Sequence, residues 1–249
     1  MSIIIKSERE IAVMREAGRI VATVLEKLKG ALKPGLKTSE LDDITVSELA
    51  RLGAQSSFKG YRGFPAHLCV SVNDELVHGI PGDRILEDGD LVSLDFGAAY
   101  QGFQGDAAIT VSIGKISPRA EELVSVTENA LKAGIAAARA GARLGDVSVA
   151  IQRYAEARGF SVIREYTGHG IGRQMHEEPQ IPNFGQPDTG PELKKGMTMA
   201  LEPMLSAGDW PTKVGRDNWT VSTADGSLCA HFEHTLAITD DQPEVLTVC

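Results

Sequence analysis

The chain is organised around the stretch Asp90-Leu-Val-Ser-Leu-Asp95-Phe-Gly-Ala-Ala-Tyr100-Gln-Gly-Phe-Gln-Gly-Asp106-Ala-Ala-Ile-Thr-Val111. Two apolar-rich runs flank a connection that contains glycine, and this pattern predicts a β-hairpin. A tight turn centred on residues 100–101 places Asp95 and Asp106 opposite each other on one face. Like charges that face each other destabilise a sheet, so the pair requires a proton or a cation between them.

A solvated face offers a simpler interpretation of the two aspartates. Pairs of carboxylates are common on exposed surfaces, and the face that carries Asp95 is only mildly apolar because Leu91 and Ser93 share it. The hairpin alone therefore leaves a metal site and an exposed acidic pair both open.

Composition limits the class of protein. The chain has 249 residues, of which 42% are hydrophobic, enough for a large core in one domain or two halves. Its net charge is −9, and Lys and Arg are scattered, which argues against a nucleic-acid surface. No apolar run approaches the ~20 residues of a membrane span, and the N-terminal apolar segment is too short for a signal peptide. Three cysteines without metal spacing favour a reducing, cytoplasmic location.

Capping and breaking residues predict the remaining elements. Ser7 and Glu10 form a capping box that begins a long amphipathic helix, which Pro34-Gly35 ends. A second helix is expected from Thr38 to about Gly53. Further helices are expected at 121–139 and 147–158, strands at 69–73, 162–163, 197–202, 219–223 and 230–238, a glycine-rich turn at 168–172 and an irregular connection at 176–195.

The second half of the chain repeats the first. The segment from Gly35 to Gly53 matches Gly141 to Gly159, and Leu86-x-x-Gly89-x-x-x-x-Leu94-Asp95 matches Leu193-x-x-Gly196-x-x-x-x-Leu201-Glu202. An acid precedes an apolar run at Asp106 and again at Glu233. These correspondences predict an internal duplication within a single domain over residues 1–249, with halves of about 1–115 and 116–249.

Pairing two such halves about a pseudo-twofold axis brings Asp95, Asp106, Glu202 and Glu233 to the centre of one sheet. Four buried carboxylates carry a charge of −4, which two divalent cations cancel and one does not. Shared protons are the alternative, although four acids are many for that solution. His169, between two glycines, is the best candidate for a neutral ligand. An oxygen-rich set with one imidazole suits Mn, Fe or Co, and two such ions form a hydrolytic device.

Two further histidines stand beside turns. His78 lies in Val77-His-Gly-Ile-Pro81 and His176 in Met175-His-Glu-Glu-Pro179. A lone histidine is more often structural, but neither of these lies in an apolar stripe, which favours a functional role. The His-Glu-x-x-His, Gly-x-Ser-x-Gly and Gly-x-x-x-x-Gly-Lys motifs are absent, which argues against a single-zinc peptidase, a serine hydrolase and a phosphate-binding loop.

Together these motifs closely resemble those of the methionine aminopeptidases, in their bacterial type I form. The motifs that carry the resemblance span nearly the whole chain: Val77-His-Gly-Ile-Pro81, Ser93-Leu-Asp-Phe-Gly97, Gly105-Asp106, Thr167-Gly-His-Gly-Ile-Gly172, His176-Glu-Glu-Pro179, Ala200-Leu-Glu-Pro-Met204 and Phe232-Glu-His-Thr235. The resemblance implies the α+β pita-bread fold, in which two pseudo-twofold-related halves share a central antiparallel sheet covered by helices.

The resemblance also implies roles for individual residues. Asp106 and Glu233 are expected to bridge two metal ions, which Asp95, His169 and Glu202 complete. His78 and His176 are expected to contact the substrate amide, and Glu202 to assist proton transfer. The pocket for a methionine side chain is expected to contain Tyr61, Phe64, Cys69, Met175 and Trp219. Met175 stands where many members have an aromatic residue, Arg62 where the loop often has His, and Cys229 near a position often filled by Ser, which leaves the shape of the pocket and any monovalent-cation site open.

The expected function is removal of the initiator methionine from chains whose second residue is small, by a monomeric cytoplasmic enzyme with two divalent ions (Mn, Fe or Co). Its partner is a peptide or nascent polypeptide, with a transient ribosome contact left open and neither nucleic acid nor membrane expected. A proline-directed peptidase or creatinase relative is the nearest alternative, but such enzymes usually carry an additional N-terminal domain for which this chain has no room. A catalytically silent binding relative is the alternative from another class; it would be expected to lack metal ligands.

Overall fold

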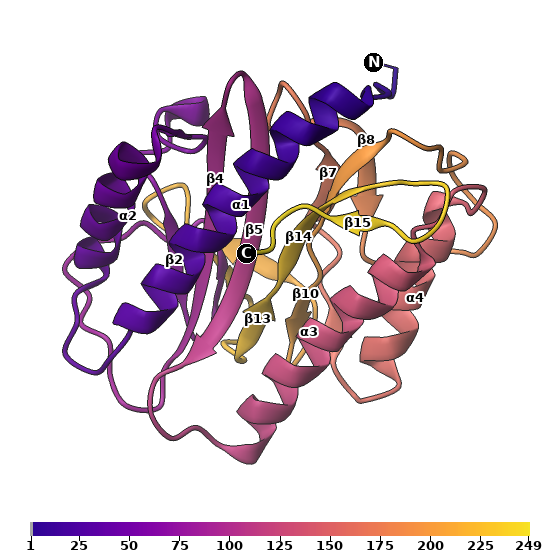
Figure 1. Cartoon of the computed structure of the whole chain (residues 1–249). Helices are drawn as coiled ribbons and strands as arrows, with labels where there is room; N and C mark the ends of the chain where they lie inside the picture. Colours follow the sequence, from indigo (N-terminus) through magenta and orange to yellow (C-terminus); the bar gives the residue numbers. More distant parts are fainter. Residues whose placement is uncertain (1) are drawn as a thin grey trace.

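The computed structural model describes residues 2–249. The fold is centred on a nine-stranded antiparallel sheet (Figure 1). Its strands run in the order β1 (Gln55–Ser56), β4 (Leu91–Tyr100), β5 (Phe103–Ser112), β14 (Glu233–Ala237), β9 (Thr198–Leu201), β7 (Thr167–Gly170) and β8 (Glu177–Pro182), with β2 (Cys69–Val72) paired to β4 and β15 (Glu244–Val245) to β14. Two three-stranded sheets are formed by β13 (Cys229–His231), β10 (Met204–Ser206) and β6 (Ser161–Val162), and by β11 (Thr212–Val214), β12 (Val221–Thr223) and β3 (Glu75–Val77).

Four α-helices are present within residues 2–249: α1 (Glu8–Ala31), α2 (Thr38–Leu52), α3 (Pro118–Ala137) and α4 (Leu144–Glu156). The predicted capping box is confirmed, because Ser7 Oγ accepts the Glu10 N–H and the Ser7 N–H donates to the Glu10 carboxylate. Helix α1 packs on β4 and β5 and α3 on β9 and β14, so both cover the same face of the sheet (Figure 1). The predicted α+β architecture is therefore confirmed.

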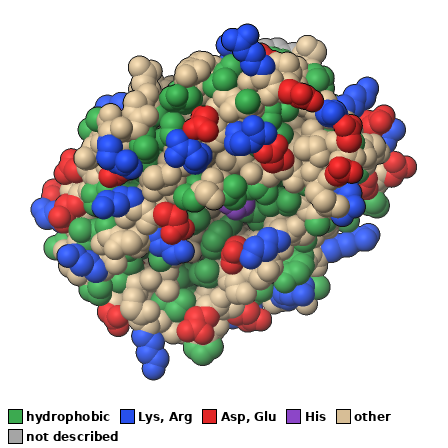
Figure 2. Space-filling model, viewed as in Figure 1, with side chains coloured by type: hydrophobic (Ala, Val, Ile, Leu, Met, Phe, Trp, Pro, Cys, Tyr) green, Lys and Arg blue, Asp and Glu red, His purple; other side chains and the backbone are tan. Residues whose placement is uncertain are grey.

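The helix-covered face is not dominated by one charge. Lys and Arg side chains are interspersed with Asp and Glu across it, with hydrophobic side chains between them (Figure 2). Within residues 2–249, none of the helices combines the length and the apolar character that crossing a membrane requires.

Contact between two glycines seats α1 directly on the central hairpin. A Cβ on Gly105 of β5 would lie 2.9 Å from the backbone nitrogen of Gly18 in α1, closer than non-bonded atoms approach. Only glycine allows this contact. Since Asp106 follows Gly105, the packing of α1 also determines where this acid lies.

The hairpin is confirmed, but its predicted register is wrong by two residues. Asp95 is paired with Ala108, and Asp106 with Gly97. The turn is centred on Gln101 and Gly102, whose φ angles are +47° and +80°, as a two-residue hairpin turn with positive φ at both positions requires. A shift of two preserves the alternation of faces, so the two acids are diagonal neighbours on the same face.

Two segments expected to be irregular are strands. The predicted glycine-rich turn at 168–172 overlaps β7, which spans residues 167–170, and the predicted irregular connection at 176–195 contains β8. Strand β7 lies between β9 and β8, and a Cβ on Gly168 would lie 2.5 Å from the carbonyl oxygen of Ala200. The glycines thus permit close packing of the strands. In the sequence alone, a glycine-rich segment of this kind is also typical of a turn.

The matched positions of the two halves also have matched geometry. Gly35 and Gly141 both have φ of +87°, and their N–H groups donate to Leu86 and Leu193 at 2.8 and 2.9 Å. Isolated bridges join Lys37 to Ile85 and, in the other half, Arg143 to Glu192. We therefore keep the internal duplication, with halves of about 1–115 and 116–249, as a proposal that these contacts support.

Candidate active site

A cavity of about 150 Å³ opens where the two halves of the sheet meet. One end of it is acidic and the other apolar. All the residues predicted for metal binding, catalysis or substrate contact line it, together with Phe58 and Arg62: Tyr61, Phe64, Cys69, His78, Asp95, Asp106, His169, Met175, His176, Glu202, Trp219 and Glu233.

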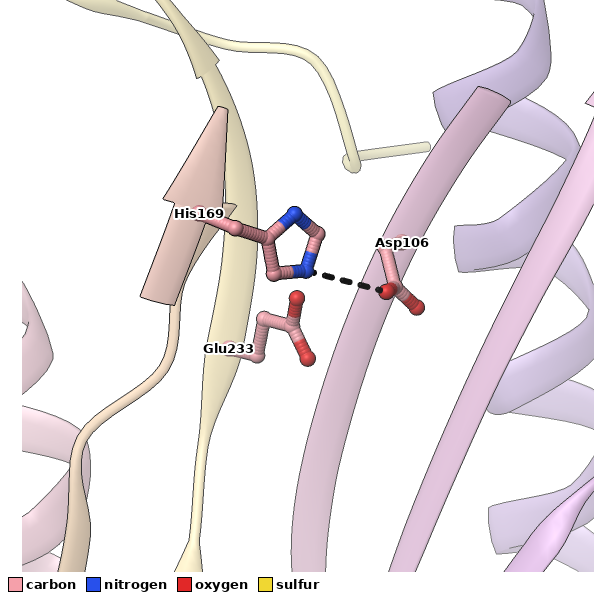
Figure 3. Close-up of side chains that lie close together, drawn as sticks. All are labelled: Asp106, His169 and Glu233. Carbon is pink, nitrogen blue, oxygen red and sulfur yellow. Dashed lines mark ion pairs between the residues drawn. The ribbon is translucent and has the colours of Figure 1, made fainter. Parts of the chain in front are cut away.

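The acidic end draws each of its side chains from a different strand. Asp95 lies in β4 and Asp106 in β5, His169 lies in β7, and Glu233 begins β14. Glu202 directly follows β9. The side chains of Asp106, His169 and Glu233 converge on one point between their strands (Figure 3).

The tautomer of His169 follows from its backbone contact. Its Nδ1 lies 2.9 Å from the carbonyl oxygen of Gly170, which can only accept, so Nδ1 carries the proton. The lone pair of Nε2 then faces two carboxylates, at 3.9 Å from Asp106 Oδ2 and 3.6 Å from Glu202 Oε1. These distances are too long for good hydrogen bonds. They suit donor atoms around one ion, because two atoms each ~2.0–2.2 Å from a zinc-sized ion lie at most ~4.4 Å apart.

The four carboxyl groups are held in an environment that disfavours their charge. Burial raises the pKa of Asp95 to about 7. Burial and then the neighbouring Asp95 raise the pKa values of Asp106 and Glu202 well above their ordinary values, and burial and then Asp106 do the same for Glu233. Within residues 2–249, Asp95 Oδ1, Asp106 Oδ1 and Glu233 Oε1 have no hydrogen-bond partner. Buried, unpartnered carboxylate oxygens beside an imidazole lone pair are a donor set that fits divalent cations.

Threonine hydroxyls fix the strands that carry this donor set. Thr235 Oγ1 accepts the Asp106 N–H at 3.0 Å and donates to the Asp106 carbonyl oxygen at 2.8 Å. Thr110 Oγ1 makes the same two contacts with the backbone of His231, both at 2.9 Å. The hydroxyls replace direct ladder bonds on either side of the short β5–β14 pairing, which holds Glu233 opposite Ala108.

His176 is oriented by an aromatic neighbour. Its ring stacks on Tyr61 with centroids 5.3 Å apart, and its Nδ1 lies 2.8 Å from the Tyr61 hydroxyl oxygen. Burial, and next His169, lower the pKa of His176 to about 3, so the ring is neutral at pH 7. When the hydroxyl donates to Nδ1, the proton of the imidazole resides on Nε2, where it can be donated.

His78 is held in an uncommon backbone conformation. Its φ is +60°, a region that few residues other than glycine occupy. The next N–H, from Gly79, donates to Ser71 Oγ at 3.1 Å. The His78 ring meets Tyr166 and Trp219 edge to face, with centroids 6.1 and 6.4 Å away. Strain of this kind is characteristic of functional sites.

The apolar end is built from aromatic and sulfur-containing side chains. Phe64 meets Trp219 edge to face at 5.2 Å and Phe58 at 6.4 Å. Cys69 and Met175 are buried in the same cluster. The cavity as a whole has a volume of about 150 Å³, comparable to a cavity that holds benzene, and the walls of its apolar end suit an unbranched apolar side chain such as that of methionine.

One histidine beside the acids was not predicted. His231 is 1% exposed, and its Nε2 lies 3.9 Å from Glu202 Oε2 and 3.7 Å from Glu233 Oε2. The signal in the sequence is its position two residues before Glu233, because alternation along an extended strand places both on one face. Phe58 was not assigned to the site, and Arg62 was named only as a position that affects the shape of the pocket; both line the cavity from the segment before β2.

Comparison with known proteins gives concordant results. The profile of metallopeptidase family M24 matches residues 12–240. Methionine aminopeptidase 1 of Bacillus subtilis is 54% identical over 98% of this chain and 99% of its own length. The methionine aminopeptidase of Clostridium acetobutylicum is 49% identical over 99% of each.

Solved structures show the same architecture. A crystal structure of methionine aminopeptidase from Thermotoga maritima superposes with a TM-score of 0.98 at 47% identity and covers 100% of both chains. A prolidase from Pyrococcus furiosus matches with a TM-score of 0.80 over 66% of its length, but at 22% identity this shows the fold alone. The pita-bread fold implied by the motifs is thereby confirmed.

Proposed function

The chain belongs to metallopeptidase family M24, and on that premise we propose that it is a methionine aminopeptidase that removes the N-terminal methionine from peptides and nascent chains whose second residue is small. Relatives named methionine aminopeptidase match it over nearly their whole length at about half identity, whereas the prolidase match covers two thirds of a longer chain. The single observation that carries the proposal is a cavity whose apolar end leads to two buried carboxyl groups, Asp106 and Glu233, and two half-buried ones, Asp95 and Glu202.

We assign Asp95, Asp106, His169, Glu202 and Glu233 as the ligands of two divalent cations, with Mn, Fe and Co as candidates. Two such ions balance the charge of the four carboxylates, and the imidazole of His169 presents its lone pair to the same point. When bound, such cations would act as Lewis acids that lower the pKa of a water, so that it could serve as a nucleophile at neutral pH.

The chain's own residues bind the substrate and move the proton. The methionine side chain occupies the apolar end, between Phe64, Trp219 and Cys69. His176 donates its Nε2 proton to the carbonyl oxygen of the scissile peptide, where negative charge develops, and His78 holds the amide. Glu202 takes the proton of the attacking water and passes it to the leaving amine. Asn183 fixes the backbone of Glu202, because its Nδ2 donates to the Glu202 carbonyl oxygen at 2.9 Å.

The test combines metal reconstitution with substrate choice. Protein stripped with a chelator is loaded with Mn, Fe or Co singly and given Met-Ala-x and x-Pro peptides. We expect release of methionine from Met-Ala-x that depends on the added metal. Faster cleavage of x-Pro peptides would support the proline-directed alternative, and binding of peptide without turnover under any metal would support a silent binding relative. We also propose that the enzyme is a cytoplasmic monomer, in keeping with its three free cysteines.

A further inference from the structure

We propose that His231 is a sixth ligand of the metal centre and that its imidazole binds the ion held between Glu202 and Glu233. This inference rests on the proposed metal centre and extends it by one imidazole. His231 ends β13 and is 1% exposed, and within residues 2–249 neither of its ring nitrogens has a hydrogen-bond partner. A buried imidazole without partners is costly unless something else satisfies it.

The donor atoms form two groups that share one acid. Asp106, His169 and Glu233 make up the first, and Glu202, His231 and Glu233 the second, and within each group the ligand atoms lie within 4.8 Å of one another. Glu233 therefore lies where a bridging carboxylate is needed. Each group contains one imidazole: His169 supplies the nitrogen donor of the first group, and His231 supplies that of the second.

The distances around the two histidines agree. His169 Nε2 lies 3.6 and 3.9 Å from its two carboxylate oxygens, and His231 Nε2 lies 3.7 and 3.9 Å from its own. Glu202 points Oε1 to His169 and Oε2 to His231. Both sets exceed the length of a good hydrogen bond and fit donors around an ion. Hydrogen bonding of His231 to the acids therefore explains its position less well than metal binding does.

The backbone of His231 is fixed for this role. Thr110 Oγ1 accepts its N–H and donates to its carbonyl oxygen, and Ser93 Oγ lies 2.8 Å from the same threonine oxygen. These residues belong to β4 and β5, the strands that carry Asp95 and Asp106. The strands that position two acids thus also position the imidazole.

A second imidazole changes the metals that the site prefers. Carboxylate and water ligands suit Mg and Mn, whereas imidazole favours Fe, Co, Ni, Cu and Zn. We expect the centre to hold Co or Zn more tightly than Mn by a margin that depends on His231. Replacing His231 with Gln should narrow this margin, because an amide oxygen resembles the existing ligands.

The test counts imidazole ligands directly. In protein loaded with Co²⁺, each ligating histidine that retains its second ring proton contributes one hyperfine-shifted N–H resonance, which disappears in D₂O. The expected result is two such resonances in the unsubstituted protein and one in His231→Gln. A single resonance in the unsubstituted protein would overturn the proposal. This result can be obtained from the unsubstituted protein alone, so the test does not depend on whether the variant folds.

Metal affinity provides the second measurement. In titration calorimetry, His231→Gln should bind one of the two Co²⁺ ions at least ~10-fold more weakly. Loss of an outer-shell partner of a ligand already weakens metal binding by ~10- to 100-fold, and loss of a ligand should cost no less. His234→Gln is the matched control, because His234 lies three residues away and contacts Thr247 Oγ1 instead. Equal affinities in the two variants, or a loss of turnover in His231→Gln without weaker binding, would refute the role as ligand. If the unsubstituted protein shows two N–H resonances but does not release methionine from peptides, the proposed function is wrong and the role of His231 as a ligand stands.

Discussion

At the scale of single residues, the contact between Tyr61 and His176 decides which ring nitrogen can act on a substrate. The Tyr61 hydroxyl occupies Nδ1 at 2.8 Å, and the low pKa of His176, about 3, keeps the ring neutral. The proton is thereby reserved for Nε2. A catalytic histidine of this type needs no carboxylate partner, which would raise its pKa.

We predict that Tyr61→Phe lowers kcat/KM about fivefold, because one hydrogen bond of about 1 kcal/mol no longer selects the tautomer. Bound metal and melting temperature should stay unchanged. His176→Ala should cost more, about 10²–10³ in kcat, as for loss of an oxyanion donor. Measuring both variants and their combination tests the coupling, and fully additive effects would show that Tyr61 does not act through His176.

Glu233 is the acid that both donor groups share, and the resemblance to methionine aminopeptidases implies that Asp106 bridges the ions with it. We predict that Glu233→Gln and Asp106→Asn lower bound metal per chain and reduce turnover more than loss of His78 or His176 does. The physical reason is that each removes a negative charge from a site whose ions balance four carboxylates, and leaves a single amide oxygen where a carboxylate offers two oxygen donors. The measurement is metal per chain by mass spectrometry beside kcat, and two metals with near-native turnover in both variants would disprove the bridging role.

At the scale of elements, the site depends on how β5 and β14 meet. These strands come from the two halves of the chain and share only the pairings of Glu233 with Ala108 and of His234 with Ala107. Beside this pairing, Thr235 satisfies both backbone groups of Asp106 with a single hydroxyl. The seam between the halves is therefore held by side chains at the point where the ligands converge.

We predict that Thr235→Val destabilises the protein by about 1–3 kcal/mol for each backbone group of Asp106 left unsatisfied. Metal affinity should also fall, by about 10- to 100-fold as for other supports of metal ligands. Thr45→Val is the control, since its buried hydroxyl bonds to Leu41 within α2, far from the acids in the sequence and outside the cavity. Denaturant unfolding and metal titration of both variants test the prediction, which fails if Thr235→Val behaves like the control.

At the scale of the whole molecule, folding concentrates four acids that would repel one another without cations. Their pKa values are raised, that of Asp95 to about 7 and the others well above their ordinary range, chiefly by burial. Without metal, the folded state therefore binds more protons than the unfolded state above the usual carboxyl pKa of about 4. Stability contributed by the protonated acids is lost as pH rises through the raised values.

We predict that the chelated protein loses melting temperature between about pH 6.5 and 8, and that the metal-loaded protein does not. The decline is expected only above about pH 6.5, because the pKa of His169 is lowered to about 4 and that of His176 to about 3. Below about pH 6.5 these rings bind more protons in the unfolded state than in the folded state, so their contribution to stability rises with pH. Asp95→Asn should flatten the decline in chelated protein. A melting temperature that is flat over this range in chelated, unsubstituted protein would contradict the prediction.

Most of the candidate site could be predicted from the sequence, because its members lie in short motifs that resemble those of a known family and its four acids stand at matched positions in the two proposed halves. Capping residues such as Ser7 and Glu10 determine helix ends through contacts between near neighbours in the chain. The acids at Asp95 and Glu202 were identifiable because each occupies the same place in a repeated pattern. Local interactions and internal repetition are properties of the sequence itself.

Other features depended on contacts between distant parts of the chain. The register of the hairpin follows the turn at Gln101-Gly102, and β7 is a strand because β9 and β8 flank it. His231 meets Glu202 only because β13 is followed at once by β14, which pairs with β9, and β9 leads into Glu202. Residue types and spacing thus indicated the expected ligands, and the motifs shared with a known family implied the fold class. The tertiary structure decided which atoms face one another, since only packing of separate strands brings a lone imidazole nitrogen within 4 Å of two carboxylates.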